Sequence, residues 1–260
     1  MKIVIAVAAH RQTWLPEGEP YLPMEAGAAL RETHLTDGAG RLLTRDDVGP
    51  NISRKNAAYC ELTVLYWLWR QQEADALGRC HYRRYFAGRR LGPKRERLLT
   101  GQQAERLLRD CDCVLPKRRH YFIQSSYDQY THAHHERDLL VTRQVLAQLP
   151  DSRYADAFDT VMRRTSGHRF NMLLMKRPLF EEYCGWLFGV LSAVEVGLDT
   201  GGYDAADGRV FGYLAERLLD VWLEVRRPAV RECPVVNLER QHWPRKILRF
   251  LRRMLRPARK

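Results

Sequence analysis

A histidine and two arginines follow a predicted strand in the string CHYRRYF, residues 80–86. Open α/β sheets bind ligands at the carboxyl ends of their strands, so these side chains are placed to do chemistry. Guanidinium groups hold phosphate oxygens in bidentate fashion and are poor ligands for Mg²⁺. The string therefore predicts that Arg83 or Arg84, with His81 and Tyr82, clamps phosphate oxygens. Because strand side chains alternate between faces, we expect only one arginine to face the site and the other to lie at the surface.

A second group of polar residues lies where a loop gives way to a predicted helix over residues 53–73. Asn51, Ser53, Lys55 and Asn56 gather at this junction. The N–H groups at a helix N-terminus, with a lysine beside them, form a natural anion site. We therefore expect these residues to bind an anionic ligand. The simpler alternative is that Ser53 only caps the helix and Lys55 is solvated.

His10 and Arg11 directly follow an apolar run over residues 3–9 that is rich in β-branched side chains. Such a run predicts a strand buried on both faces, as in a parallel sheet. The run is short for a secretion signal and leads straight into two polar residues, so we do not expect a signal peptide. His10 and Arg11 are then predicted to lie at a ligand-binding edge.

The elements that must position these residues alternate between strands and helices, which predicts a layered α/β fold. The chain has 260 residues, of which 45% are hydrophobic, enough for one sizeable core. Residues 12–50 are rich in proline and glycine and are expected to form a long functional loop. Strands are expected over residues 3–9, 75–80, 113–116, 169–175 and 235–237, and helices over 53–73, 102–110, 132–149, 154–164, 179–194 and 210–225.

The cysteines and the hydropathy indicate a cytoplasmic protein without a membrane span. The six cysteines show no C-x-x-C pairing and no regular spacing, which predicts reduced and mostly buried thiols. No stretch approaches the ~20 consecutive apolar residues that a spanning helix needs.

Positive charge is concentrated at the C-terminal end of the chain. The formal net charge is +12, and eight basic residues without any acid lie beyond position 241. Over residues 244–257 apolar side chains recur at helical spacing and arginines fill the opposite face, which predicts an amphipathic helix on an anionic membrane surface. The alternatives are an RNA-binding tail and a helix that binds a partner. We expect one domain over residues 1–240 and a membrane-associating tail over 241–260. The residues expected to contact the membrane are Trp243, Arg249, Phe250, Arg252 and Arg253.

Four stretches, taken together, resemble a known family. They are YLPMEAGAA at residues 21–29, DVGPNISRKNAAYCELT at 47–63, CHYRRYF at 80–86, and FNMLLMK at 170–176 with ERL at 216–218. They resemble the glycosyltransferase family of bacterial capsule and exopolysaccharide gene clusters long catalogued as a domain of unknown function. Some members of that family are galactofuranosyltransferases. The resemblance covers about residues 1–240 in order.

The resemblance implies a GT-A-like fold, which is a Rossmann-type α/β/α sandwich with a mostly parallel central sheet. It also implies a nucleotide-sugar donor, with uridine diphosphate expected, and a lipid-linked oligosaccharide acceptor at the inner face of the membrane. The diphosphate must be stabilised as it leaves, by a divalent metal or by fixed cations. We expect fixed cations, namely Arg83, Arg84 or both, with His81. His10, Arg11 and the residues of the 51–56 junction are then expected to bind the donor.

Inverting transfer also needs a general base for the acceptor hydroxyl. The base expected from the resemblance is Glu216, with Arg217 as a phosphate or ion-pair partner and with Gly212 allowing close approach of the substrate. A surface Glu–Arg pair is the alternative, and Asp47 and Asp138 are weaker candidates. The residues expected to bind the acceptor are His135, Asp138 and Asn171, although capping by His135 and Asp138 and a buried structural role for Asn171 remain open.

Two strings resemble metal sites without fulfilling their requirements. Asp110-Cys111-Asp112 has the letters of the GT-A metal motif, but it follows a helical pattern and precedes its strand. The histidines at 132, 134 and 135 have no second ligand pair at metal-site spacing. We therefore expect no cofactor, with a divalent metal not favoured, and no nucleic acid partner. The competing function class is a non-catalytic basic module that binds nucleic acid or membrane.

Overall fold

A mostly parallel sheet with strand order β10-β6-β9-β4-β1-β2-β3 forms the centre of the fold. The computed structural model describes residues 1–121 and 123–239. Only β9 runs antiparallel to its neighbours β4 and β6 in this order, so the expected mostly parallel sheet is confirmed. The strands are β1 (Ile3–Ala9), β2 (Tyr21–Glu25), β3 (Thr44–Arg45), β4 (Ala76–His81), β6 (Cys113–Pro116), β9 (Leu173–Lys176) and β10 (Val230–Cys233).

Strand β1 is buried on both faces, as its continuous apolar sequence predicts. Ile5 and Val7 pack on one side of the sheet in the same apolar cluster as α3 (Gly101–Arg109). Ala6 and Ala8 pack on the other side in the cluster that contains the apolar side chains of the remaining long helices. The alternation of β1 side chains thus joins two apolar layers through one sheet.

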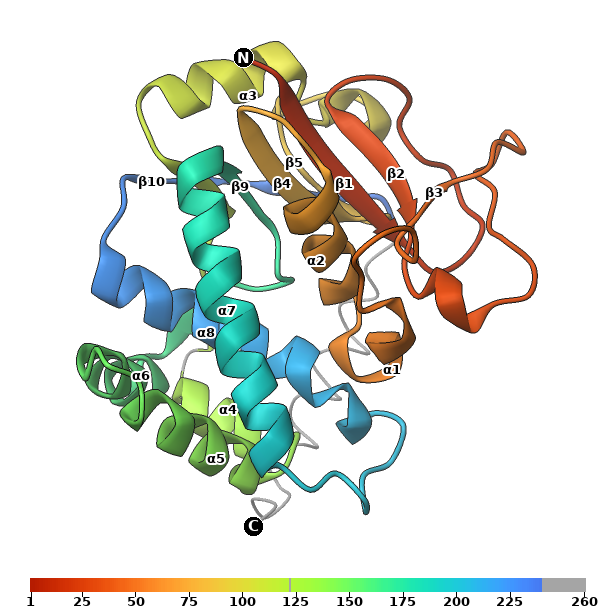
Figure 1. The fold of residues 1–260 in the computed structure, drawn as a ribbon. Helices are drawn as coiled ribbons and strands as arrows, with labels where there is room; N and C mark the ends of the chain where they lie inside the picture. The colour runs from red at the N-terminus through yellow and green to blue at the C-terminus, as the bar shows by residue number, and fades with distance from the viewer. Residues whose placement is uncertain (122, 240–260) are drawn as a thin grey trace.

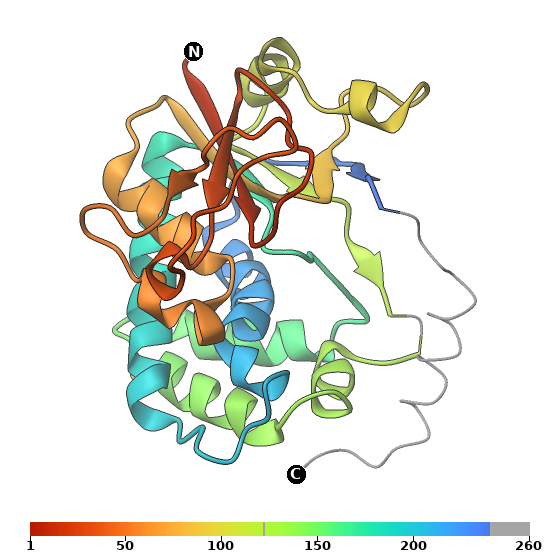
Figure 2. The ribbon, with the colours of Figure 1, turned by 90° about the vertical axis from the view of Figure 1, so that its right-hand side faces the viewer.

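The two faces of the sheet carry layers of unequal thickness. On one face, α2 and α7 pack against β1, β4 and β9, and further helices extend this side into a helical lobe below the sheet (Figures 1 and 2). The other face is covered by α3 and by the antiparallel pair of β5 (Arg84–Phe86) and β11 (Val235–Asn237). The helices of the thick layer are α2 (Leu62–Gln71), α4 (Ser126–Thr131), α5 (Glu136–Ala147), α6 (Arg153–Arg163), α7 (Arg177–Gly197) and α8 (Val210–Arg226).

Short elements fill the connections. They are α1 (Asn56–Tyr59), the 3₁₀ helices η1 (Ala28–Leu30), η2 (Ser53–Lys55), η3 (Lys94–Arg97) and η4 (Asp207–Arg209), and the paired strands β7 (Arg119–His120) and β8 (Ser166–Gly167).

Three expectations about local structure are wrong, two of them because of an unusual backbone conformation. The expected loop over 12–50 contains β2 and β3. The expected helix over 53–73 is broken into η2, α1 and α2, because Cys60 has a positive φ of 52°. The expected strand over 169–175 begins only at Leu173, because Phe170 and Asn171 have φ values of 77° and 48°, outside the strand region.

The structure bears on the expectations about the cysteines and about a membrane span, but it does not describe the C-terminal tail. All six cysteines are free thiols and buried, as expected. Among the described residues, no helix is long and apolar enough to cross a membrane. The predicted tail, with Trp243, Arg249, Phe250, Arg252 and Arg253, lies outside the described residues, so its membrane role stays a prediction.

Candidate active site

Two adjoining cavities lie at the carboxyl ends of β1 and β4, the edge where open α/β sheets bind ligands. Their volumes are about 670 Å³ and about 300 Å³. Because they share five lining residues, they form one continuous hollow with a junction between a larger and a smaller cavity. The shared residues are Cys60, Glu61, His81, Arg83 and Arg209. The larger cavity also contains His10, Arg11, Asn56 and Tyr82, and the smaller one Arg84, Gln129, His134, Arg169, Tyr213, Glu216 and Arg217.

The string at 80–86 folds as a tight hairpin, and this brings both of its arginines to the hollow. His81 at the end of β4 pairs with Arg84 at the start of β5, so Tyr82 and Arg83 form a two-residue turn. Arg83 and Arg84 both line the smaller cavity. The expectation that only one would face the site is therefore wrong, because strand alternation does not continue through a turn.

The hollow carries an excess of positive charge. Six arginines and two glutamates line it among the described residues. Burial and then repulsion by Arg83 lower the pKa of Arg84, and burial and then repulsion by Arg169 lower the pKa of Arg217. An incoming anion would stabilise the charged form of both guanidinium groups.

His81 does not contribute to that charge. Burial, followed by the positive charges of Arg79 and Arg83, lowers the pKa of His81 to about 2. Burial, and then Arg83, also lowers the pKa of His10. At neutral pH His81 would therefore take part in the predicted clamp as a neutral side chain, whereas the arginines supply the positive charge. A neutral imidazole still has one N–H to donate to a phosphate oxygen.

The sequence does not single out Arg79, but its side chain holds the backbone and a carboxylate next to the hollow. It is fully buried in β4, and its Nε donates to the carbonyl oxygen of Asn171 at 2.9 Å. Its Nη2 also donates to the carbonyl oxygens of Phe170 and Asn171 and lies 3.8 Å from Oε1 of Glu61. Because Phe170 and Asn171 hold left-handed backbone conformations, this guanidinium fixes the turn that delivers Arg169. The sequence feature that could have indicated this role is that Arg79 is the single charged residue in the otherwise apolar string at 76–80.

Glu216 lies in the smaller cavity, in the second turn of α8 rather than at its start. Its Oε1 accepts a hydrogen bond from the backbone N–H of Phe170 at 2.8 Å. Its Oε2 accepts from Nη1 of Arg169 at 3.2 Å and from Nη1 of Arg217 at 3.3 Å. Both oxygens therefore hold parts of the site in place.

The family of this chain is shown by a match to a family model. Residues 4–227 match the family model described as a domain of unknown function, DUF4422. The chain belongs to the DUF4422 family. A comparison with curated proteins finds no match.

The solved structures that match this DUF4422 chain include that of the WbbM bifunctional glycosyltransferase in its apo form. The match has a TM-score of 0.82 and 24% sequence identity, and it covers 92% of this chain and 46% of the WbbM chain. This likeness confirms the GT-A-like fold. The DUF4422 chain thus spans less than half the length of WbbM.

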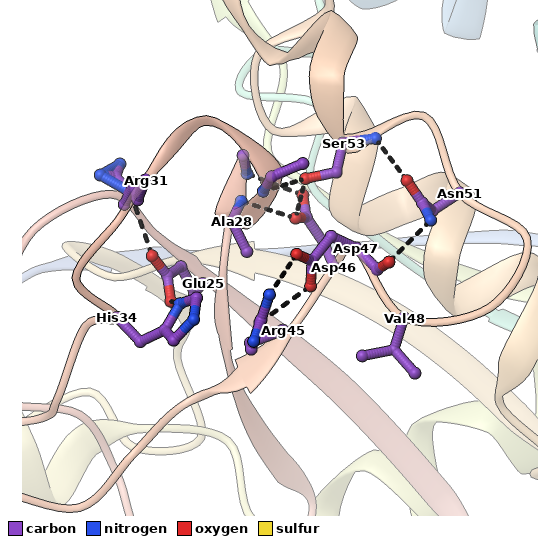
Figure 3. A network of polar contacts seen from close by, with 12 residues as sticks. Glu25, Ala28, Arg31, His34, Arg45, Asp46, Asp47, Val48, Asn51 and Ser53 are labelled. Carbon is purple, nitrogen blue, oxygen red and sulfur yellow. Dashed lines mark hydrogen bonds and ion pairs between the residues drawn. The ribbon is translucent and has the colours of Figure 1, made fainter.

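Three residues of the 51–56 junction lie away from the hollow in this DUF4422 fold. Ser53 is buried, donates from Oγ to Oδ1 of Asp46 at 2.5 Å, and does not cap a helix through its side chain (Figure 3). Asn51 donates to the carbonyl oxygens of Asp47 and Gly49. Lys55 pairs with Glu195, with 2.6 Å between Nζ and Oε2. The helical turn that starts at Ser53 therefore does not face the hollow, and only Asn56 of this junction reaches the larger cavity.

Two of the residues expected to bind the acceptor, His135 and Asp138, contact other side chains of the fold instead of lining the hollow. Asp138 is buried and accepts hydrogen bonds from the hydroxyl groups of Tyr130, at 2.7 Å, and of Tyr203. Burial raises the pKa of Asp138. His135 stacks on Tyr203 with 4.4 Å between ring centroids. Neither His135 nor Asp138 lines the hollow in the described part of the chain.

Asn171 and Gly212 support each other across the wall of the smaller cavity. The Asn171 side-chain amide donates to the Gly212 carbonyl at 3.0 Å and to Oε1 of Glu61 at 3.2 Å. A Cβ atom at Gly212 would lie 3.2 Å from Sγ of Cys60. Gly212 thus lets the turn at Cys60 pack against α8. From the sequence, Gly212 was expected to allow close approach of a substrate instead.

Of the two strings that resemble metal sites, the one at 110–112 lies away from the hollow, and His132 of the other bonds to a backbone carbonyl. Asp112 pairs with Lys176, with 3.2 Å between Oδ1 and Nζ, at the amino end of β6, the edge opposite to the hollow. His132 bonds through Nδ1 to the carbonyl oxygen of Asp128 at 2.6 Å. Within residues 1–121 and 123–239, no group of three or more His, Cys, Asp or Glu side chains has the arrangement of a metal site.

Proposed function

We propose that this DUF4422 chain is a glycosyltransferase that moves a sugar from a uridine-diphosphate sugar to a saccharide acceptor. The observation that carries this proposal is the cluster of arginines that line the hollow at the carboxyl edge of a Rossmann-type sheet. Burial and then repulsion by a neighbouring arginine lower the pKa values of two of these arginines, Arg84 and Arg217, so a bound anion would stabilise their charged forms. The GT-A-like fold and the likeness to WbbM support the same conclusion.

The arginines suit the chemistry of a leaving diphosphate. When the bond between the sugar and the diphosphate breaks, negative charge builds up on the diphosphate oxygens. Arg83 and Arg84 follow each other on the hairpin between β4 and β5, line the smaller cavity and offer donors for that charge. Inside a partly buried hollow such donors interact more strongly than they would in water. Departure of the diphosphate is then expected to need no divalent metal.

The proposal places the reaction at a membrane surface. A lipid-linked acceptor in capsule or exopolysaccharide synthesis would lie at the cytoplasmic face of the cell membrane. The basic sequence over 241–260 has the composition of a segment that binds anionic lipids. Peripheral attachment would bring the hollow to such an acceptor without a spanning helix.

The first experiment measures binding of uridine diphosphate by calorimetry and thermal shift, with a short RNA as competitor. Uridine diphosphate should raise the melting temperature by mass action, and the RNA should not displace it. Transfer from a panel of uridine-diphosphate sugars should continue in the presence of a chelator. Absence of nucleotide binding, or displacement by RNA, would favour a nucleic-acid-binding module instead. A large loss of transfer in chelator would refute the metal-independent clamp.

A further inference from the structure

Glu61 occupies the junction where the two cavities meet. It owes this position to the break in the helix at Cys60, whose φ of 52° ends α1 and starts α2 in a new direction. A continuous helix over 53–73 would have carried Glu61 as an ordinary helical side chain. In the observed fold, the Glu61 side chain is 17% exposed and lines both cavities.

The contacts of Glu61 hold one of its oxygens and leave the other available. Its Oε1 accepts a hydrogen bond from the Asn171 amide at 3.2 Å and lies 3.8 Å from Nη2 of Arg79. Its Oε2 has no hydrogen bond within the described part of the chain. A general base needs such a free lone pair within reach of the proton that it removes.

Glu216 is the other carboxylate of the hollow, and its contacts differ. Its oxygens accept one backbone and two guanidinium hydrogen bonds. Accepting a proton would disrupt bonds that hold Phe170, Arg169 and Arg217 in place. The geometry therefore separates the two carboxylates into one that is available to a substrate and one that positions the arginines.

The two cavities differ in the ligand that they suit. The larger one opens beside His10, Arg11 and Arg83 at the end of β1, where a Rossmann-type sheet binds nucleotides. The smaller one contains the stacked rings of His134 and Tyr213, 4.0 Å apart. Sugar rings present C–H faces to aromatic rings and hydroxyl edges to polar groups. Donor and acceptor would thus meet at the junction.

We propose that Glu61, and not Glu216, is the general base of the transfer, an assignment that rests on the proposed function. Its Oε2 removes the proton of the acceptor hydroxyl while the hydroxyl oxygen bonds to the anomeric carbon of the donor sugar. The bond between that carbon and the diphosphate oxygen breaks, and the electron pair leaves with the diphosphate, next to Arg83, Arg84 and Arg209. The proton ends on Glu61 and then passes to water. The anomeric configuration is inverted.

The test compares Glu61→Gln, Glu61→Asp and Glu216→Gln with the full-length wild type. The matched control is Glu73→Gln, an exposed residue just beyond α2 at the opposite edge of the sheet. Release of uridine diphosphate is measured from a panel of uridine-diphosphate hexoses, with octyl hexosides or water as acceptor. Calorimetry measures uridine diphosphate binding to each variant.

Glu61→Gln should lower kcat by on the order of 10²–10⁴-fold while the affinity for uridine diphosphate stays nearly unchanged. Glu61→Asp should retain part of the activity, and Glu73→Gln all of it. Glu216→Gln should keep more activity than Glu61→Gln and weaken uridine diphosphate binding.

Full activity of Glu61→Gln, loss of its nucleotide binding, or a product of retained configuration would overturn the assignment of Glu61 alone. A wild type that binds no uridine diphosphate, or releases none from any donor, would overturn the proposed function itself.

Discussion

The carboxylate of Glu239 lies against the guanidinium of Arg83, with 3.4 Å between Oε2 and Nη1, although 156 positions separate the two residues. Its other oxygen lies 2.5 Å from Nη2 of Arg11. One carboxylate thus bridges two arginines beside the larger cavity, in the manner that a phosphate group would. Under the proposed function, an incoming diphosphate would have to compete with this internal anion.

Replacing Glu239 by glutamine should therefore tighten binding of uridine diphosphate. The expected gain is roughly 2- to 5-fold, because exposed ion pairs contribute about 0–1 kcal/mol. The gain should shrink as salt screens the charges. Calorimetry at two ionic strengths measures it, with Glu73→Gln as the control. Weaker binding by Glu239→Gln would show that the carboxylate helps to orient the arginines.

Replacing Arg83 or Arg84 by alanine should lower kcat by on the order of 10²–10³-fold, the usual effect of removing one donor to a developing negative charge. Arg84→Lys should recover only part of the loss, because an ammonium group lacks the planar fork of a guanidinium. Steady-state kinetics measures each variant, and Arg90→Ala, in an exposed loop, is the control. Unchanged kinetics in the double alanine variant would remove the clamp from the mechanism.

Replacing Arg79 by methionine should destabilise the protein by about 3 kcal/mol, a typical effect of breaking a buried charged network. The carbonyl oxygens of Phe170 and Asn171 would lose their donor, and Glu61 would lose its cationic neighbour. Urea unfolding measures the change. Arg106→Met, an exposed position on α3, should leave the midpoint where it is. Equal midpoints for the two variants would contradict a supporting role for Arg79.

The pKa of His81 predicts how stability depends on pH. Its folded value is about 2, lowered chiefly by burial, and an imidazole in an unfolded chain titrates near 6.5. Between these values only the unfolded chain binds the proton. The stability contribution is thus fully present above about pH 6.5 and falls with decreasing pH, by at most about 1.4 kcal/mol per pH unit. His81→Gln should flatten this dependence in urea unfolding between pH 7.5 and 4. Parallel curves for the two proteins would mean that native His81 accepts the proton.

The sequence predicts the fold where local pattern and tertiary structure agree. The apolar runs of β1 and β6 give strands with the expected bounds, because both faces of each strand are buried. The helical spacing over 210–225 likewise matches α8 within a residue. The position of Arg83 and Arg84 at the ligand edge follows from the end of β4, which the sequence also indicates.

The rest of the site depends on backbone turns that composition does not reveal. The positive φ of Cys60 redirects Glu61, and the left-handed pair Phe170–Asn171 delivers Arg169. Glycine marks such conformations in many sequences, but here non-glycine residues adopt them. Ser53 is a residue type that often caps helices, and the sequence therefore suggested a cap. In the structure its hydroxyl group donates to the buried carboxylate of Asp46 instead. Burial of Arg79 is likewise a tertiary property.

The buried guanidinium of Arg79 also limits how this protein can be engineered. A common route to a more heat-resistant variant exchanges an interior charge for a well-packed apolar side chain. At this strand the exchange would leave the carbonyl oxygens of Phe170 and Asn171 without their donor and release the bend that holds Arg169, so both thermal tolerance and turnover would be lost. Libraries aimed at robustness should therefore keep β4 constant and vary the outer surface of α3.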